Sequence, residues 1–397
     1  MMYSFLVLAK NSSKQFSILD FVSCIVFLYI LACTIATYIY PPISRLDFYT
    51  YIAATKAATN GLPLYTALYK ESSFTYPPSI FLFFLPFLSL PVALATSIWN
   101  SLSLFSILLC SYLLLTTVQK RVRLAFAFLI FGAMLVSEPF RETLLFGQNN
   151  AAVLLFILLS FFFSQKKASR YHIVGGIFFG IATALKVFPV FLLIYFLCKK
   201  QWVVSGVGVC VFLLFLIAGT FGHIQYIWDY IHFSRTVISS SVAISKDQSF
   251  SSLLLFTFPY MQNFQTTITM GVYASSVFVC SVLWKKLPKE LLSDFFFFSS
   301  VLGCTILIIT PLAWIHHLLF VFPFCIFLFA QAVSKKDTFS IVLFLLTLFL
   351  ILFNGEYVIL FLRSRHFTEI PFIQFHALLG LFIGLIGEYI YLTYSKA

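Results

Sequence analysis

The chain has 397 residues, of which 61% are hydrophobic and 10% charged, and its formal net charge is +12. No soluble core could bury so much apolar surface, so the composition excludes a soluble globular protein and indicates several membrane crossings. The positive charge does not indicate nucleic acid binding. The basic residues fall in short clusters between apolar runs, where they act as topology signals.

Apolar runs of helical length recur along the chain and predict an all-α polytopic membrane protein, because lipid-exposed backbone must satisfy its own hydrogen bonds. The alternating ten-residue segments of a barrel do not occur. The runs cover residues 18–40, 77–118, 124–137, 150–164, 172–198, 202–222, 265–284, 291–310, 314–334, 338–353 and 371–394. We expect about twelve crossings from these lengths.

Two runs are too long for one simple crossing, and they leave two topologies open. The positive-inside rule favours one crossing for 77–118 and two for 172–198. Length favours a split near Pro91 with 172–198 kept whole. The topology that length favours places the 147–150 loop on the opposite side of the membrane from the topology that the positive-inside rule favours. Both choices place the two termini in the cytoplasm and residues 47 and 316 outside.

The whole of 1–397 is expected to form one integral membrane domain, since it contains neither a solenoid repeat nor a low-complexity linker. The short apolar start is followed by Lys10 and Lys14 and is not a cleavable signal peptide, so the first helix should stay in the membrane. The eight cysteines lie in or beside apolar runs without paired spacing in a polar loop. We therefore predict neither disulfides nor a zinc site.

The loop after the first apolar run predicts a short interfacial helix over residues 47–58, which the sequence Asn-Gly-Leu-Pro at 60–63 ends. Asp47 and Tyr51 are four residues apart and share a face, so a carboxylate and a phenol could point together toward a site. Ser44 and Asp47 also fit a capping box, in which the carboxylate would only bind backbone donors. The residues alone leave both interpretations open.

Three consecutive amides, Gln148, Asn149 and Asn150, follow Gly147 at the start of an apolar run. Uncharged amides can bind sugar hydroxyls. The alternative is that Asn149 or Asn150 caps the helix that follows, and we expect this role for at least one of them.

Lys186 stands inside an apolar run, where a charge is costly and indicates a functional role. A phosphate partner would explain it, and so would a lysine that reaches the interface from two short helices. Adjacent His316 and His317 point about 100° apart on a helix and make a poor chelating pair. One is interpreted as a hydrogen-bond donor to phosphate or as a proton carrier, and the other as a packing residue. The alternative is that both belong to an aromatic belt with Trp314.

Several short motifs occur in a characteristic order. They are Asp47-Phe48 with Tyr51 and Ala53-Ala54, Gly61-Leu62-Pro63-Leu64-Tyr65, Phe74-Thr75-Tyr76-Pro77-Pro78 followed by Pro86 and Pro91, Gly147-Gln148-Asn149, Gly180 to Pro189, and Pro311 to His317. In this order and spacing the chain resembles glycosyltransferase family 87. The motifs span 47–317 and make 18–317 the most family-like part, whereas 318–397 corresponds only as C-terminal transmembrane helices.

The resemblance implies the class C glycosyltransferase fold and a polyprenyl-phosphate-mannose-dependent mannosyltransferase. It implies a multi-pass protein of the plasma (inner) membrane whose active site faces away from the cytoplasm. The donor would be a polyprenyl-phosphate sugar in the bilayer and the acceptor a glycan or glycolipid. Asp47 matches the acidic residue of the family's first loop, proposed as the base.

The sequence is consistent with an inverting displacement in which Asp47 takes the proton of the attacking hydroxyl. Lys186, His316 or an arginine of an outer loop would stabilise the departing phosphate. We expect no metal or cofactor, because the sequence has neither a glycine-rich phosphate loop nor an Asp-x-Asp triplet. The residues expected to bind substrate are Tyr51, Tyr76, Gln148, Asn149, Lys186, His316 and His317.

Two other functions are considered. A lipid-linked oligosaccharide ligase or polymerase would work at the same membrane face but would leave a polyprenyl-phosphate sugar untouched. A transporter is disfavoured, because the two halves of the chain show no matching pattern of broken helices and few ionisable residues lie deep in the apolar runs.

Overall fold

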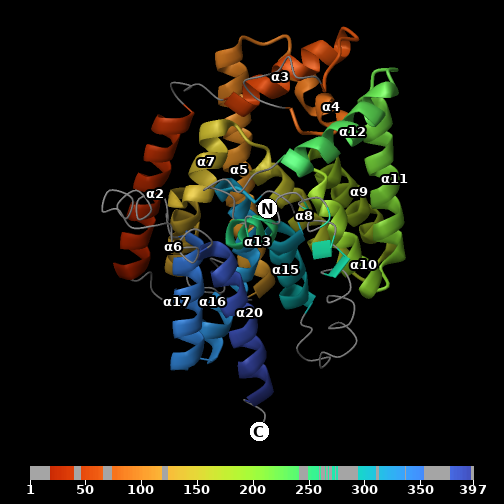
Figure 1. The fold of residues 1–397 in the computed structure, drawn as a ribbon. Helices are drawn as coiled ribbons and strands as arrows, with labels where there is room; N and C mark the ends of the chain where they lie inside the picture. The colour runs from red at the N-terminus through yellow and green to blue at the C-terminus, as the bar shows by residue number, and fades with distance from the viewer. Residues whose placement is uncertain are drawn as a thin grey trace.

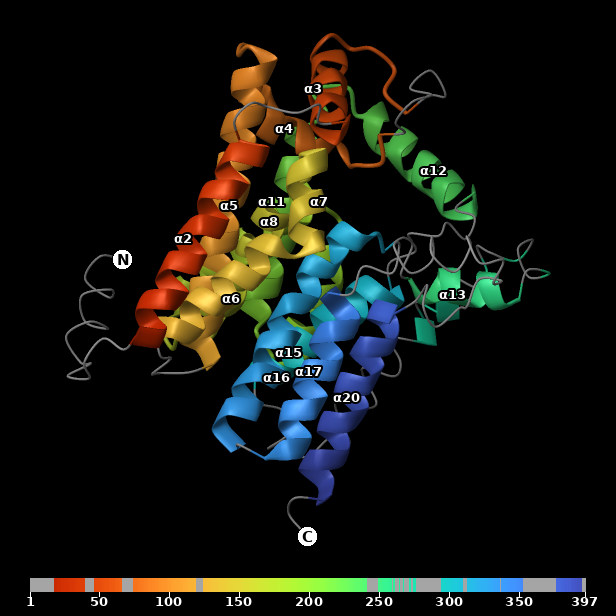
Figure 2. The same cartoon turned by 90° about the vertical axis from the view of Figure 1, so that its left-hand side faces the viewer.

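The computed structural model describes residues 18–39, 46–65, 74–118, 124–240, 249–258, 294–309, 313–335, 337–352 and 376–394, with a few single residues between 260 and 275. Every element in these ranges is helical, which confirms the all-α prediction. Figures 1 and 2 show α3, α4 and α12 at one end of the molecule and the C-terminus at the other.

Three helical stretches in the described part of the chain are long and apolar enough to cross a membrane, Asp20–Tyr38, Val92–Thr116 and Ile315–Lys335. The bent pair Glu138–Phe146 and Asn150–Ser164 would make a fourth span if counted as one. This agrees with a protein of several crossings, and the predicted number of about twelve stays a prediction.

Helix α2 (Ile18–Tyr38) lies at the side of the bundle and packs against α6 (Leu124–Val136). Many of its apolar side chains are exposed, among them those of Phe21, Ile25 and Tyr29. An exposed apolar stripe of this length is typical of a helix that faces lipid.

The predicted interfacial helix is present as α3 (Leu46–Thr59), and Gly61 follows it with φ +67°. Phe48 is fully buried on α3 and packs against an aromatic group that includes Phe84 and Trp99. This apolar packing fixes α3 against the helices below it, so the direction of the polar side chains on its other positions is also fixed.

The run 77–118 divides near Pro91, as its length predicted. Short helical turns, η1 (Pro78–Ile80), α4 (Phe81–Phe84) and η2 (Leu85–Phe87), precede the long α5 (Val92–Val118).

The run 172–198 also divides, into α9 (Ser169–Leu185), η3 (Phe188–Leu192) and α10 (Leu193–Cys198). Of the two alternatives left open for this run, the structure therefore has the divided helix and not the unbroken one that length favoured. Pro189 lacks the N–H that would bond to the carbonyl of Leu185, so the helix ends and Lys186 is extended, with φ −157° and ψ 129°.

Helices α7 (Glu138–Phe146) and α8 (Asn150–Ser164) meet at a bend of 118°. Helix α9 packs closely on α11 (Trp202–Ala218), because glycines such as Gly176, Gly180 and Gly208 face the neighbouring backbone. α12 (Gln225–Ser240) lies beside the first loop, where the Tyr226 hydroxyl donates to the Leu62 carbonyl.

The remaining described helices complete the buried core around α8. They are α13 (Phe250–Thr257), α15 (Asp294–Cys304) with its π-helical extension η5 (Thr305–Ile309), η6 (Ile315–Val321), α16 (Phe322–Lys335), α17 (Thr338–Leu352) and α20 (His376–Tyr394). Apolar side chains of α8, α9, α15 and α16 share one core. The short η6 at the start of α16 faces α7 and the bend.

Candidate active site

The bend between α7 and α8 is built by Gly147, which closes α7 in the left-handed region at φ 67° and ψ 36°. Its N–H bonds to carbonyls of the last turn, and the N–H of Gln148 donates to the Thr143 carbonyl at 2.8 Å. The indole N–H of Trp99 on α5 donates to the Gly147 carbonyl at 2.9 Å. These bonds satisfy the free backbone groups of a sharp turn and so fix the amides that follow it.

Gln148 projects from the bend to α3. Its amide nitrogen donates to Asp47, while its amide oxygen accepts from the Tyr76 hydroxyl at 2.9 Å. The Tyr51 hydroxyl lies 2.8 Å from that of Tyr76 and 3.2 Å from the same amide oxygen. Asp47 and Tyr51 therefore share a helix face, as their spacing predicted.

Burial raises the pKa of the Asp47 carboxyl, and the charges of His316 and Lys186 and the bond from Gln148 oppose that rise. Burial also raises the pKa of the Tyr51 and Tyr76 hydroxyls, so both phenols stay neutral donors. A partly buried carboxylate near positive groups has the character of a functional acid or base. The proposed capping partner Ser44 lies outside the described residues.

Asn149 occupies the N-cap position of α8 but its side chain makes no capping bond. It is fully buried, and its amide nitrogen donates to the Leu185 carbonyl at 2.9 Å. Because Pro189 removes the helical donor of that carbonyl, Asn149 replaces the missing bond. The capping prediction is wrong for Asn149, and the structure places this amide at the end of α9 rather than against Asp47.

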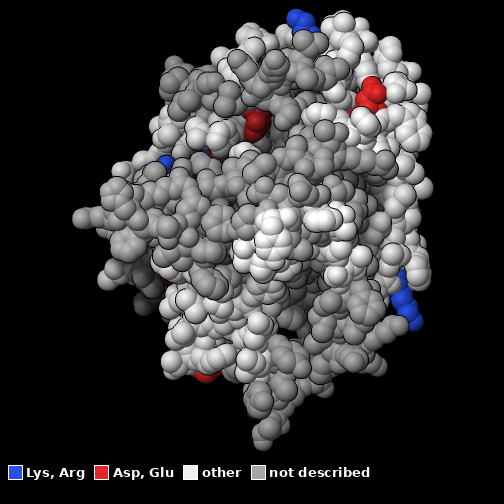
Figure 3. Space-filling view, in the orientation of Figure 1, with Lys and Arg blue, Asp and Glu red and all other residues white. Residues whose placement is uncertain are grey.

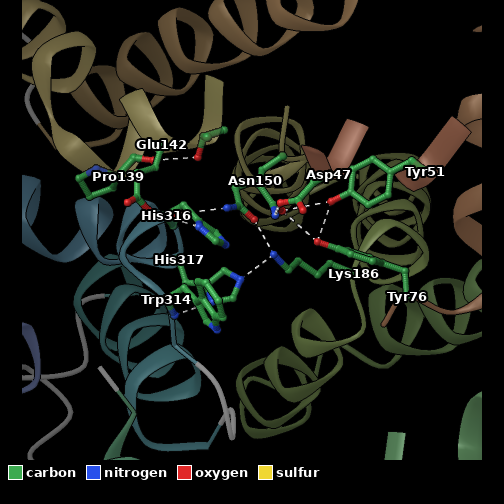
Figure 4. Close-up of polar contacts among 12 residues, drawn as sticks. Asp47, Tyr51, Tyr76, Pro139, Glu142, Asn150, Lys186, Trp314, His316 and His317 are labelled. Carbon is green, nitrogen blue, oxygen red and sulfur yellow. Dashed lines mark hydrogen bonds and ion pairs between the residues drawn. The ribbon is translucent and has the colours of Figure 1, made fainter. Parts of the chain in front are cut away.

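Lys186 extends from the break after α9 into a group of polar side chains (Figure 4). Its amino group donates to the Asn150 side-chain oxygen at 2.7 Å and lies 2.7 Å from Nε2 of His317. Nδ1 of His317 accepts from the backbone N–H of Trp314 at 3.2 Å, which fixes the ring. The amino group also lies 5.7 Å from the centre of the Tyr76 ring.

His316 points to the other side of η6. Its Nδ1 lies 3.5 Å from a carboxylate oxygen of Glu142 on α7, and its backbone carbonyl accepts from the Asn150 amide at 3.1 Å. The two histidines thus have different partners, as expected for adjacent residues on a helix. Asn150 connects Lys186 to the His316 backbone, since its side chain binds both.

The structure therefore brings most of the predicted binding residues into one site. Four of its members lie on or against α3 and form the α3 side of the site: Asp47, Tyr51, Tyr76 and Gln148. The other three lie on or against η6 and form the η6 side: Lys186, His316 and His317. Asn150 and Glu142 join the site without having been predicted as binding residues. Their signal was weak, because a helix-start asparagine and an acidic residue before a bend both have ordinary structural roles.

Within the described residues, no group of three His, Cys, Asp or Glu side chains is placed to hold a metal ion. On the face shown in Figure 3, the charged side chains of described residues are few and scattered. A charged group in the interior is costly unless it is paired, so the clustering of Asp47, Glu142 and Lys186 is a specific feature of this site.

A bundle with membrane-spanning helices and a charged polar site near the end formed by α3 is the architecture of an integral membrane protein with a built functional site. Comparison with known families matches residues 74–353 to Glycosyltransferase family 87. That match covers more than half of the sequence, and the chain belongs to this family.

Two curated relatives come from Mycolicibacterium smegmatis. A polyprenol-phosphate-mannose-dependent alpha-(1-2)-phosphatidylinositol mannoside mannosyltransferase is 27% identical over 178 residues, which cover 40% of this chain and 39% of that protein. A polyprenol-phosphate-mannose-dependent alpha-(1-2)-phosphatidylinositol pentamannoside mannosyltransferase is 22% identical over 316 residues, or 75% of this chain and 73% of that protein. The first match thus spans well under half of its relative.

Proposed function

We propose that this protein transfers a hexose, most simply mannose, from a polyprenyl-phosphate sugar to a hydroxyl of a glycolipid or glycan. The observation that carries the proposal is the family membership together with two relatives named for the same lipid-linked mannose donor. The reaction takes place at the extracytoplasmic face of the plasma (inner) membrane, with both termini in the cytoplasm.

Asp47 acts as the base. The acceptor oxygen attacks the anomeric carbon, its proton passes to the Asp47 carboxylate, and the bond from that carbon to the phosphate oxygen breaks with its electron pair. One such displacement inverts the sugar carbon. The proposal is supported by the placement of Asp47, which is held by a side-chain amide and lies near Lys186 and His316.

The departing polyprenyl phosphate binds on the η6 side of the site. Lys186 supplies an amino group that a bound phosphate keeps protonated, His317 supplies an imidazole, and Asn150 holds the amino group in place. Charge-assisted bonds to phosphate oxygens strengthen as the negative charge grows, so they favour the transition state over the bound donor. The class C fold and the contacts of Tyr51, Tyr76 and His316 with substrate are part of this proposal, whereas Asn149 is buried against Leu185 and holds the end of α9.

The decisive experiment incubates the purified protein with labelled polyprenyl-phosphate-mannose and a lipid extract of the source cells. Asp47→Asn should abolish transfer and leave donor binding nearly intact, because it removes the proton acceptor and little else. Asp294→Asn, which alters a carboxylate paired with Lys199 on the surface, is the matched control and should retain activity.

If Asp47→Asn keeps most of the wild-type turnover, the Asp47 carboxylate has a structural role only. A wild-type protein that leaves the labelled donor unconsumed would instead favour the ligase or polymerase. Mass spectrometry of glycolipids from cells with and without the gene would then identify the product that the protein makes.

A further inference from the structure

The hydrogen bonds around Gln148 run in one direction. Each phenol has a single hydrogen to donate, and the hydroxyl of Tyr76 is 2.9 Å from the amide oxygen of Gln148. The hydroxyl of Tyr51 is closer to Tyr76, at 2.8 Å, than to Gln148, at 3.2 Å. The chain of donors therefore runs from Tyr51 to Tyr76, from Tyr76 to Gln148, and from Gln148 to Asp47.

This direction determines which end of the Gln148 amide faces Asp47. An ionised carboxylate only accepts hydrogen bonds, so the NH2 end must face it and the oxygen must face the phenols. Rotating the amide by half a turn would place two acceptor oxygens together and leave the Tyr76 hydrogen without its acceptor. Bonds in such a chain also polarise one another in a buried site.

The backbone of Gln148 is held as firmly as its side chain. Its own N–H bonds to Thr143, the preceding Gly147 carbonyl is held by Trp99, and the following Asn149 is fixed on Leu185. These contacts come from α5, α7 and the end of α9, so the amide projects from a turn anchored on three sides. Its side chain is buried.

We propose that Gln148 is a positioning residue, whose amide, oriented by the hydroxyls of Tyr76 and Tyr51, holds the Asp47 carboxylate in its ionised form and in one orientation. The second carboxylate oxygen is thereby directed to the proton of the acceptor hydroxyl. This assignment deepens the proposed function and rests on it. It gives Gln148 a role beyond the sugar contact expected from its residue type.

The test measures the ionisation of Asp47 directly. A carbodiimide with glycine ethyl ester labels the carboxyl, and mass spectrometry follows labelling of Asp47 against pH in the full-length protein in detergent. In Gln148→Leu the midpoint of ionisation should rise by about one pH unit, since a donor to the charged form is lost. The acid limb of the kcat/KM profile should move equally, and kcat should fall about tenfold to a hundredfold with a smaller change in donor KM.

Gln165→Leu is the matched control. Gln165 lies at the other end of α8, where its amide nitrogen binds the hydroxyl of Tyr195, and its loss should leave the Asp47 midpoint unchanged. Tyr76→Phe should raise the midpoint less than Gln148→Leu, because the amide remains but loses the bond that orients it. If Gln148→Leu does not fold, the same measurement on Gln148→Asn replaces it. This variant keeps an amide, but its side chain is one methylene too short to reach Asp47, so the midpoint should also rise.

An unchanged midpoint and acid limb in folded Gln148→Leu or Gln148→Asn would overturn the assignment. That failure is distinct from failure of the proposed function, which appears as transfer by Asp47→Asn. The labelling result does not depend on turnover, so it tests the role of Gln148 whichever acceptor the protein uses.

Discussion

At the scale of single residues, the site places the Asp47 carboxylate and the Lys186 amino group on opposite sides of the bend between α7 and α8. Asp47 depends on Gln148, and Lys186 depends on Asn150 and His317. Each charged group therefore has a neutral amide that fixes its direction. Such fixed polar groups act on developing charge without reorganising during the reaction.

The raised pKa of Asp47 gives opposite predictions for activity and for stability. A base must be ionised, so the rate should rise with pH through a midpoint above the usual value for aspartate. A carboxyl whose pKa is raised by folding favours the folded state below its unfolded pKa, and this contribution is lost as pH rises through the folded value. Rate profiles and thermal unfolding curves recorded from about pH 4 to about pH 8 measure the pH dependence of the activity and of the stability.

Asp47→Asn should accordingly be at least as heat-stable as the wild-type protein at neutral pH, although it is inactive. The substitution removes a charge that burial destabilises. A large drop in the unfolding temperature at pH 7 would contradict this expectation and indicate that the carboxylate mainly holds α3 in place.

Lys186→Met should weaken binding of the lipid-linked donor about tenfold to a hundredfold, because it removes a charge-assisted bond to phosphate. Methionine keeps most of the apolar length of the side chain. Lys56→Met, on an exposed position of α3, is the control and should bind the donor as the wild type does. Titration with polyprenyl-phosphate-mannose measures both, and equal affinities would remove Lys186 from the phosphate site.

At the scale of elements, breaks in helices create the site. α9 ends at Leu185 because Pro189 cannot donate, and the free carbonyl is then taken by Asn149, while Ser79 donates to the neighbouring Ala184 carbonyl at 2.7 Å. The same break extends Lys186 into the site. Gly147 provides the second break, which aims the adjacent amides at α3 and at the end of α9.

Helix α9, which ends at one of these breaks, packs closely on α11, and this close packing can be tested at Gly180. A Cβ built there meets the Gly208 carbonyl oxygen at 2.6 Å and the Val211 Cβ at 2.6 Å. Gly180→Val should therefore destabilise the protein by about 1–3 kcal/mol through overpacking. Gly206→Ala is the control, since a Cβ built there meets no described atom from beyond its own turn of helix within 4 Å. Thermal unfolding in detergent distinguishes the two, and equal stabilities would contradict the close packing.

At the scale of the whole molecule, the site joins segments that are distant in sequence. Gln148 and Asp47 are 101 residues apart, and Lys186 and His317 are 131 residues apart. A ligand that binds several of these segments at once binds only the folded chain, so it stabilises the fold by mass action.

Polyprenyl-phosphate-mannose at about 100 times its dissociation constant should stabilise the wild-type protein by ~2.7 kcal/mol. Lys186→Met at the same donor concentration should gain much less, because its affinity is lower. The unfolding temperature with and without donor measures this difference. An equal gain for both proteins would show that the lipid acts through the detergent micelle instead of the site.

The sequence by itself determined the all-α membrane architecture, the helix of the first loop and the family, because hydrophobic length, helix signals and ordered motifs are local in the chain. It also identified Asp47 and Tyr51 as one face, since helical spacing is local too. The break at Lys186 follows from Pro189 and is local as well. The pairing of Gln148 with Asp47 and the separate partners of His316 and His317 were decided by tertiary structure. Side-chain pairing across more than a hundred residues depends on how helices pack, and no local pattern records it.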